Sequence, residues 1–409
     1  MRILHTSDWH LGQNFMGKSR EEEHQAFFIW LLKRIQSEQI TLLLVAGDIF
    51  DTTTPPNYAL ELYYNFLKEL STVDNLTTII VAGNHDSIAT LKTSQQLLKA
   101  LNIHVVTKGD SEEHQIIPIY KNKKMQALVC AVPFLRDSIL RQSQSGEGIR
   151  EREKFANQAI KEYYEALYQK ALKLLKERGL NGKDIPIIST GHLTTVGARS
   201  SESERDIYIG GTFDIGGDFL GKNFDYVALG HLHINQKVGC EHVRYSGSPI
   251  PLSFSEAKSI KKVNIIEFLM PKSKRANSKA IEVKTVEIPT HRPLLLLKGS
   301  LEEIVVALKA IENQETWIEV QLTDDDNPFA SNQTIRDLAK ALELTLLAVK
   351  INKSEKLLRA KEMNVISLDD LGVSEVFEKR LKMENLESKD FEKELIQTFN
   401  VVLERVNSQ

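Results

Sequence analysis

The sequence predicts an α/β protein, and two observations support this expectation. In the first hundred residues, short apolar segments of strand length alternate three times with segments whose apolar residues recur at helical spacing. Such an alternation predicts parallel strands joined by right-handed crossovers. The second observation is that polar, ligand-capable side chains follow these strands, where open α/β sheets place their functional sites.

The first half of the chain is expected to form the parallel sheet. Its strands are predicted at 2–7, 41–46 and 78–81, and its helices at 21–37, 54–70 and 88–101. The strand at 78–81 consists of four apolar or β-branched residues in a row, which predicts burial on both of its faces. It runs into a glycine turn and then into three polar residues, so the chain is organised around this stretch.

A second sheet is expected downstream. Its strands are predicted at 125–133, 185–190, 225–229, 243–245 and 263–268, and short connections make us expect a mostly antiparallel arrangement. A polar loop at 143–148 precedes a long helix at 151–179. We expect that helix to pack on the core through an apolar stripe formed by Phe155, Ala159, Tyr163, Leu167, Ala171 and Leu174.

At 409 residues the chain is too long for one ordinary core, so several units are expected, at 1–275, 285–355 and 365–409. A charged, non-periodic linker at 271–279 separates the first two. The second unit is a small α+β domain in which strands at 294–298, 317–322 and 344–351 alternate with helices at 301–312 and 332–342. The third is a helical hairpin at 374–406, which either caps its own domain or offers a groove to a partner helix.

The composition is that of a folded globular protein, with 42% hydrophobic and 26% charged residues. No apolar run is long enough to span a membrane and no signal peptide precedes the first strand, so we expect a cytoplasmic protein. Cys130 and Cys240 lack a metal-ligand spacing, which favours reduced thiols, with a disulfide as the alternative. The net charge of −3 does not indicate nucleic-acid binding, but a local basic groove or a partner subunit can supply phosphate contacts.

Five strand ends carry candidate metal ligands. Each alone has an ordinary explanation as a hydrogen-bonded structural residue, but together they are expected to place seven groups at one edge of one sheet. Carboxylate, imidazole and amide oxygen suit Mn²⁺, with Mg²⁺, Fe²⁺ and Zn²⁺ as alternatives. Seven ligands exceed the need of one ion but fit two ions that share a carboxylate, a pair suited to displacement at phosphorus. The seven are Asp8, His10, Asp48, Asn84, His192, His231 and His233.

The motifs DWH, GDIFD, GNHD, GH and GHLH, in this order, resemble those of the calcineurin-like metallophosphoesterases over residues 1 to about 270. The resemblance implies a two-sheet sandwich flanked by helices. It implies that His85 is the catalytic group at the phosphate, that Asp86 either orients His85 or caps a turn, and that Asp51 is a polar group close to the site. It also divides the ligands between one metal held by Asp8, His10, Asp48 and His233, and a second held by Asp48, Asn84, His192 and His231.

Longer phrases narrow the resemblance. Protein phosphatases of this superfamily carry an arginine after the second motif and GNHE, whereas this chain has GDIFDTT and GNHD. The phrases HTSDWHLG, ERDIYIGG, RYSGSPIPLSFSE and HRPLLLLKGSLEEI resemble the nuclease subunits of bacterial double-strand-break repair complexes. This resemblance implies a manganese-dependent DNA nuclease, acting as a 3′→5′ exonuclease on duplex DNA and as an endonuclease on single strands and hairpins. It further implies a homodimer and an SMC-like ATPase partner that docks on the C-terminal hairpin.

Two surfaces are expected from the same resemblance. Helices at 57–70 and 88–101 would form the dimer contact, although core packing explains their apolar residues Tyr58, Leu62, Tyr63 and Phe66 equally well. Arg199, Arg205 and the lysine-rich run at 272–279 are candidates for DNA contacts, and a solvated surface charge is the simpler explanation of any single one. Two other functions compete: a small-molecule phosphodiesterase on the same scaffold, and a DNA-tethering scaffold with a vestigial metal site.

Overall fold

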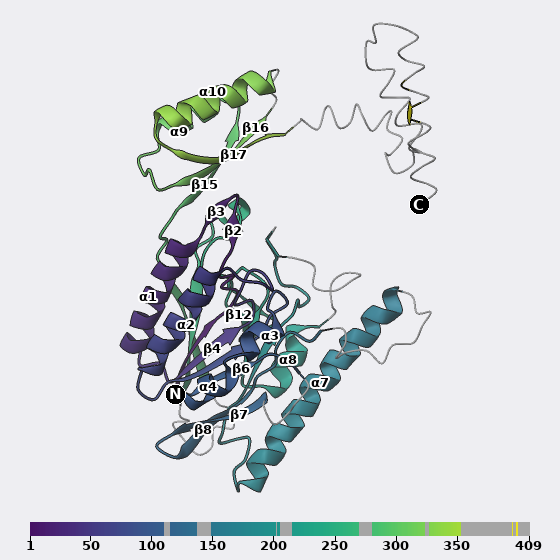
Figure 1. The fold of residues 1–409 in the computed structure, drawn as a ribbon. Coiled ribbons are helices and arrows are strands. Elements are labelled where there is room, and N and C mark those ends of the chain that lie inside the picture. Colours follow the sequence, from purple (N-terminus) through teal and green to yellow (C-terminus); the bar gives the residue numbers. More distant parts are fainter. Residues whose placement is uncertain are drawn as a thin grey trace.

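Figure 1 shows the protein in a computed structural model, in which a smaller α/β unit lies beside a larger body. The structure describes residues 1–109, 115–136, 149–201, 203–204, 215–269, 280–323 and 327–352, together with 395, 398 and 399. The loop expected at 143–148 and the linker expected at 271–279 lie outside these residues. So does the C-terminal hairpin, apart from the three single positions.

The first sheet of the larger body contains the predicted parallel strands. Within it, β1, β4, β5 and β6 run parallel, and β13 and β14 continue the sheet antiparallel beyond β1. The repeated strand-loop-helix prediction is therefore confirmed. In spatial order the strands are β14 (Ala280–Glu287), β13 (Lys262–Leu269), β1 (Arg2–Thr6), β4 (Leu42–Ala46), β5 (Thr77–Val81) and β6 (Ile103–Val106).

The second sheet differs from the prediction in strand direction and in membership. Strands β8, β9, β10 and β12 are mutually parallel, and only the two edge strands pair antiparallel. The connections after β8 and β9 contain helices, which return the chain to the same end of the sheet. The strand expected at 263–268 pairs with β1 in the first sheet instead. The spatial order is β11 (Gln236–Val238), β12 (Cys240–Tyr245), β10 (Tyr226–Gly230), β9 (Ile187–His192), β8 (Lys124–Cys130) and β7 (Ile116–Lys121).

The two sheets pack face to face, with helices covering their outer faces (Figure 1). One outer layer contains α1 (Glu21–Ser37) and α2 (Asn57–Ser71), and the other contains α7 (Ile149–Glu177) and α8 (Gly217–Asn223). Buried side chains such as Ile79 and Ile188 fill the space between the sheets. This is the two-sheet sandwich flanked by helices that the resemblance implied.

Several helix predictions need correction. The helix expected at 88–101 is two short helices, α3 (Ile88–Lys92) and α4 (Gln95–Ala100). The buried stripe of α7 is out of phase with the predicted one, because only Leu167 and Ala171 belong to both, while Phe155 is 63% exposed. The stripe that packs on the core consists of Ile160, Tyr164, Leu167, Ala171 and Leu175.

The smaller unit is a three-stranded parallel sheet with its two helices on the side away from the larger body (Figure 1). Four buried side chains join it to the larger body: Phe15, Phe254, Leu294 and Trp317. Phe254 belongs to the short helix η1 (Phe254–Glu256), and Phe15 to the hairpin β2 (Asn14–Phe15) and β3 (Lys18–Ser19). The unit's own elements are β15 (Leu294–Gly299), α9 (Leu301–Lys309), β16 (Trp317–Thr323), α10 (Pro328–Ala341) and β17 (Thr345–Asn352).

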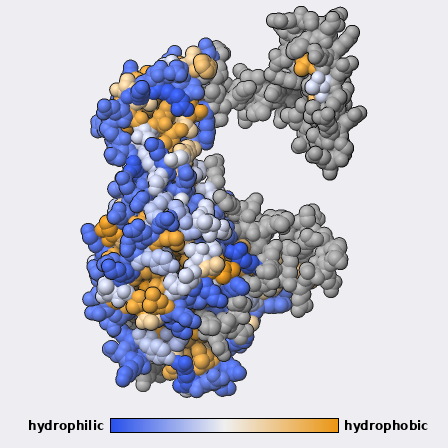
Figure 2. All heavy atoms as spheres, in the orientation of Figure 1, coloured by the Kyte–Doolittle hydropathy of each residue, from blue (hydrophilic) through white to orange (hydrophobic). Residues whose placement is uncertain are grey.

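The burial of the α2 side chains shows which residues of the expected dimer face belong to the core instead. Tyr63 and Phe66 are buried in the core beneath α2, so core packing explains them, whereas Tyr58 and Leu62 are partly buried against the same cluster. Cys130 and Cys240 are both free, as expected for reduced thiols. Among the described helices, none combines the length and the apolar character that a bilayer span requires. Figure 2 shows a mainly hydrophilic surface, interrupted by apolar patches.

Candidate metal centre

The seven predicted ligands gather where strands of both sheets end, and not at the edge of a single sheet as expected, because the two sheets pack face to face. Asp8 and His10 follow β1, Asp48 follows β4 and Asn84 follows β5. From the second sheet, β9 ends at His192, and β10 is followed by His231 and His233. All are buried except Asn84, which is partly exposed.

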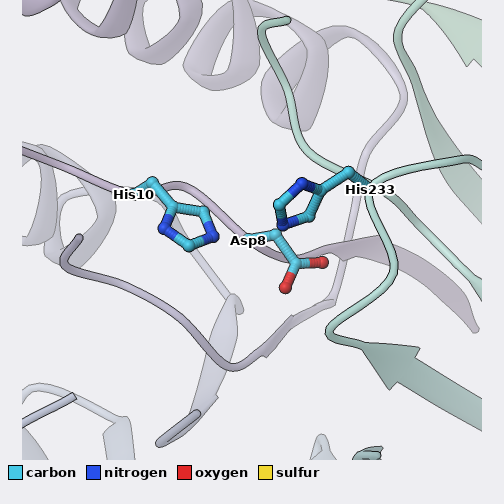
Figure 3. Close-up of side chains that lie close together, drawn as sticks. All are labelled: Asp8, His10 and His233. Carbon is cyan, nitrogen blue, oxygen red and sulfur yellow. The ribbon is translucent and has the colours of Figure 1, made fainter. Parts of the chain in front are cut away.

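Six of these side chains form two clusters that have no member in common. One contains Asp8, His10 and His233, whose ligand atoms all lie within 4.8 Å of one another. Figure 3 shows the His10 and His233 rings on either side of Asp8. The other cluster contains Asp48, His192 and His231 under the same limit. Each cluster contains three of the four residues expected at one metal position.

The backbone is strained at four of the seven positions. Asp8, His10, Asp48 and His231 have φ values of 52°, 48°, 48° and 98°, in the left-handed region that L-residues rarely adopt. Such strain costs about 1–3 kcal/mol per residue and persists only when the surroundings hold it. Here the loops after β1 and β4 hold each other in place. The backbone N–H of Asp8 donates to the Gly47 carbonyl and the backbone N–H of His10 donates to the Asp48 carbonyl, each at 3.0 Å.

Asp48 lies between the two clusters. Its Oδ2 is 3.3 Å from His192 Nε2 and 3.6 Å from His10 Nε2. Burial alone would raise the pKa of the Asp48 carboxyl, but the His192 and His10 imidazoles outweigh it and hold this pKa well below its usual range. Asp48 is therefore an anion that faces both clusters, as a shared ligand must be.

The His10 ring shows that a cation fits the first cluster. Its Nδ1 lies 3.1 Å from Asp51 Oδ1, and because an ionised carboxylate only accepts, Nδ1 carries the proton of the neutral ring. The lone pair of Nε2 then faces the Asp48 carboxylate, and Nε2 is buried without a hydrogen-bond partner among the described residues. Two acceptors that face each other in a buried site are stabilised by a positive ion between them.

The His192 ring shows that a cation also fits the second cluster. Its Nδ1 bonds the Ala46 carbonyl at 3.0 Å, so Nδ1 is the donor, and Nε2 faces Asn84 Oδ1 at 2.9 Å and Asp48. In the metal-free chain a proton on His192 Nε2 lies between this nitrogen and the oxygens of Asn84 and Asp48. Burial opposes a charge on His192, but Asp48 and Asp8 raise its pKa to about 9. A divalent cation can replace that proton with the same ligands.

His85 and Asp51 line the solvent side of the first cluster, and both are partly exposed. His85 Nδ1 lies 2.7 Å from the Asp51 carbonyl oxygen and must donate to it, since a carbonyl only accepts. The His85 and His10 ring centroids are 4.9 Å apart, in an edge-on arrangement. Nε2 of His85 is therefore the ring atom suited to exchange a proton with a substrate.

Asp86 braces the loops of the site. Its buried carboxylate accepts hydrogen bonds from the backbone N–H groups of Gly83, Ile49 and Phe50, at 2.8, 3.2 and 3.0 Å. Burial raises its pKa to about 6. These bonds are of the turn-capping kind, and they also tie the GNHD loop to the loop after β4. The bond that orients the His85 ring comes from the Asp51 carbonyl instead.

The structure leaves the expected DNA contacts as predictions. Arg199 is exposed, and its backbone N–H and carbonyl pair with the Gln236 side chain. Arg205 and the run at 272–279 lie outside the described residues.

Sequence reasoning missed a set of residues behind His233. Ser203 Oγ lies 2.6 Å from His233 Nδ1 and bonds Glu256, whose other oxygen accepts from Lys261 at 2.5 Å. Burial would raise the pKa of Glu256, but His233 and Lys261 hold it well below its usual range. Glu256 ends the phrase RYSGSPIPLSFSE, yet its sequence neighbours give no sign that it reaches the metal centre.

Comparison with known proteins gives consistent matches along the chain. Residues 1–235 match the family model described as calcineurin-like phosphoesterase, and residues 290–385 match one described as type 5 capsule protein repressor C-terminal domain. Three similar proteins each carry the name of the SbcD subunit of nuclease SbcCD. The protein from Escherichia coli K12 is 41% identical over 95% of this chain and 94% of its own length. The proteins from Rhodobacter capsulatus and Bacillus subtilis are 34% and 30% identical, over 75% and 83% of both chains.

Proposed function

Because this chain belongs to the calcineurin-like phosphoesterases and, within them, to the SbcD family of nuclease subunits, we propose that it hydrolyses phosphodiester bonds in DNA as part of an SbcCD complex. The chain is thus a metal-dependent phosphodiesterase of a nuclease family. Its finer activity, as a 3′→5′ exonuclease on duplex DNA and an endonuclease on single strands and hairpins, is part of the proposal. We also propose that the protein acts in the cytoplasm.

One observation of the site carries the chemistry. The buried Asp48 carboxylate faces His192 Nε2 on one side and His10 Nε2 on the other, and the latter has no hydrogen-bond partner among the described residues. This arrangement supports two divalent cations that share Asp48. The first would be held by Asp8, His10, Asp48 and His233, and the second by Asp48, Asn84, His192 and His231. We propose Mn²⁺ for both, because imidazole, carboxylate and amide oxygen together suit that ion.

When bound, two such ions supply an activated water and neutralise charge on the attacking and leaving oxygens. The chain's own residues place the substrate and move the proton. His85 stands at the partly exposed side of the centre, with Nδ1 held by the Asp51 carbonyl. Its Nε2 would contact the scissile phosphate and protonate the leaving oxygen. The Asp51 side chain holds the His10 ring at 3.1 Å, so it acts through a ligand.

The partners follow from the family. We propose that the chain works with SbcC, the SMC-like ATPase, as a homodimer within a heterotetramer. The proposed units are the nuclease domain at 1–275, the small capping domain at 285–355 and the partner-binding helices at 365–409. The match of residues 290–385 to a C-terminal family model supports the presence of a unit beyond the nuclease domain.

The test is a cleavage assay with the purified chain and Mn²⁺, with and without the ATPase partner. Linear duplexes labelled at either end, a hairpin duplex and a chromogenic phosphodiester are the substrates, and an Asp48→Ala chain is the negative control. We expect shortening of the linear duplex from its 3′ ends and opening of the hairpin. If all DNA stays intact while the small diester is turned over, the small-molecule phosphodiesterase replaces this proposal. If the Asp48→Ala chain tethers DNA ends fully and the parent cuts nothing, the DNA-tethering scaffold replaces this proposal.

A further inference from the structure

We propose that Ser203 and Glu256 are positioning residues that hold His233 in the tautomer whose Nε2 can bind a metal ion. This inference rests on the proposed function, because it concerns a ligand of the proposed centre. Neither residue belongs to the seven ligands, and neither contributes a ligand atom to the two clusters.

The direction of each proton in this set follows from chemistry. The Glu256 carboxylate is paired with the Lys261 ammonium at 2.5 Å and only accepts hydrogen bonds, so the Ser203 hydroxyl donates to it. Ser203 Oγ must then accept from His233 Nδ1, which lies 2.6 Å away. Nδ1 of His233 consequently carries the ring proton, and the lone pair of the neutral ring is on Nε2.

The orientation of the ring agrees with this assignment. Figure 3 shows one ring nitrogen of His233 turned toward Asp8 and the other turned away from it. The nitrogen that bonds Ser203 is Nδ1, next to the ring carbon that joins the side chain to the backbone. Nε2 is therefore the atom that faces Asp8. Hydrogen bonding behind a ligating imidazole fixes its tautomer and raises its basicity as a ligand.

Burial and a counter-charge make the set rigid. Glu256 is 1% exposed and Lys261 is 7% exposed, so the charge of Glu256 requires a partner. Lys261 Nζ donates to Glu256 Oε2 at 2.5 Å, to Ser248 Oγ at 2.8 Å and to the His233 carbonyl at 3.2 Å. The same ammonium group thus anchors both the carboxylate and the backbone of the ligand that it supports.

The helix η1 connects this set to the smaller unit. Glu256 and Phe254 lie two residues apart on η1, and Phe254 packs with Phe15, Leu294 and Trp317 at the junction of the two bodies.

The test is Mn²⁺ titration of the full chain by calorimetry, with the parent, Ser203→Ala and Ser203→Thr. Ser203→Ala keeps the ion pair between Glu256 and Lys261, whereas Glu256→Gln would leave Lys261 without its counter-charge and can prevent folding. We expect Ser203→Ala to weaken one of two Mn²⁺ binding events by about 10–100-fold and to leave the other unchanged. Ser203→Thr keeps a hydroxyl and should restore the affinity.

Ser255→Ala is the matched control, because it is the same substitution at an exposed position of η1. Its isotherm and its metal-free melting temperature should equal those of the parent, and the metal-free melting temperature of Ser203→Ala should stay close to it. A Ser203→Ala isotherm identical to that of the parent would overturn the inference. If the parent binds two ions but cuts no DNA, the proposed function fails while the isotherm still decides the role of Ser203. If the parent binds no ion, both fail.

Discussion

The backbone N–H of His85 donates to Asp48 Oδ1 at 3.0 Å. The residue proposed to protonate the leaving group is thereby held in place against the carboxylate proposed to lie between the two ions. The bond uses the backbone of His85 and neither ring nitrogen, so the position of Asp48 does not depend on the imidazole. Metal binding and proton transfer can therefore be separated by mutation.

His85→Ala should keep both metal ions and lose cleavage. The backbone bond to Asp48 survives this substitution, so we expect unchanged Mn²⁺ stoichiometry by calorimetry. The rate of DNA cleavage under saturating Mn²⁺ should fall by about 10²–10⁴-fold, the usual contribution of a general acid. His291→Ala, at an exposed position, is the control and should cut like the parent. Loss of a metal ion from the His85→Ala chain would make His85 a ligand instead.

Asp48→Asn should weaken both ions, whereas Asn84→Ala should weaken only one. Asp48 faces His10 on one side and His192 on the other, and its charge holds both clusters together. Of the other candidate ligands, Asn84 is hydrogen-bonded to His192, with 2.9 Å between Asn84 Oδ1 and His192 Nε2. Mn²⁺ titration gives the number of sites directly. If Asp48→Asn retains one site of parental affinity, the shared-carboxylate arrangement is wrong.

Gly47→Ala should disturb the metal centre, and Gly17→Ala should not. Both glycines have positive φ, at +91° and +84°, so alanine incurs a similar backbone strain of about 1–2 kcal/mol at each. At Gly47 the new Cβ would lie 2.1 Å from His192 Nδ1, while at Gly17 no atom of the described residues lies within 4 Å. We expect both variants to lower the melting temperature, and only Gly47→Ala to lose Mn²⁺ affinity. Equal affinities in the two variants would contradict this.

Two buried imidazoles should make the metal-free chain sensitive to acid. Burial lowers the pKa of His5 and of His24 to about 3, from an ordinary value of 6.5. Between these values the unfolded chain binds protons that the folded chain does not, so stability falls as the pH drops from 6.5 toward 3. The loss reaches about 5 kcal/mol per imidazole at the acid end.

Urea unfolding in EDTA at several pH values measures this loss. We expect His24→Gln, which keeps a donor for the Trp9 carbonyl, to reduce the slope of unfolding free energy against pH. The reduction should approach about 1.4 kcal/mol per pH unit, which corresponds to one proton. His291→Gln should leave the slope unchanged. A slope in His24→Gln equal to that of the parent would show that His24 is protonated in the folded chain.

Local patterns predicted the parts of the fold that depend on neighbouring residues. The strand at 78–81 was recognisable because all of its side chains are apolar or β-branched, and it is buried throughout. The relative direction of the strands in the second sheet was not recognisable from the sequence. The helices between these strands, rather than the strands themselves, determine whether the chain returns parallel. The phase of α7 was also missed, because Phe155 has the same apolar character as Ile160 and only the position of the helix over the sheet decides which is buried.

The order and identity of the seven candidate ligands can be read from the sequence, because each lies at or just after the end of a strand whose pattern is local. The fold alone decides what supports them. Glu256 reaches His233 through Ser203, 53 residues away in the chain, and Asp86 reaches Phe50 across 36 residues. These contacts depend on how the two sheets and their loops pack, and no local pattern of side chains encodes such a distance. The sequence thus determined which side chains are candidate metal ligands, and the tertiary structure brought them together and set the hydrogen bonds that orient them.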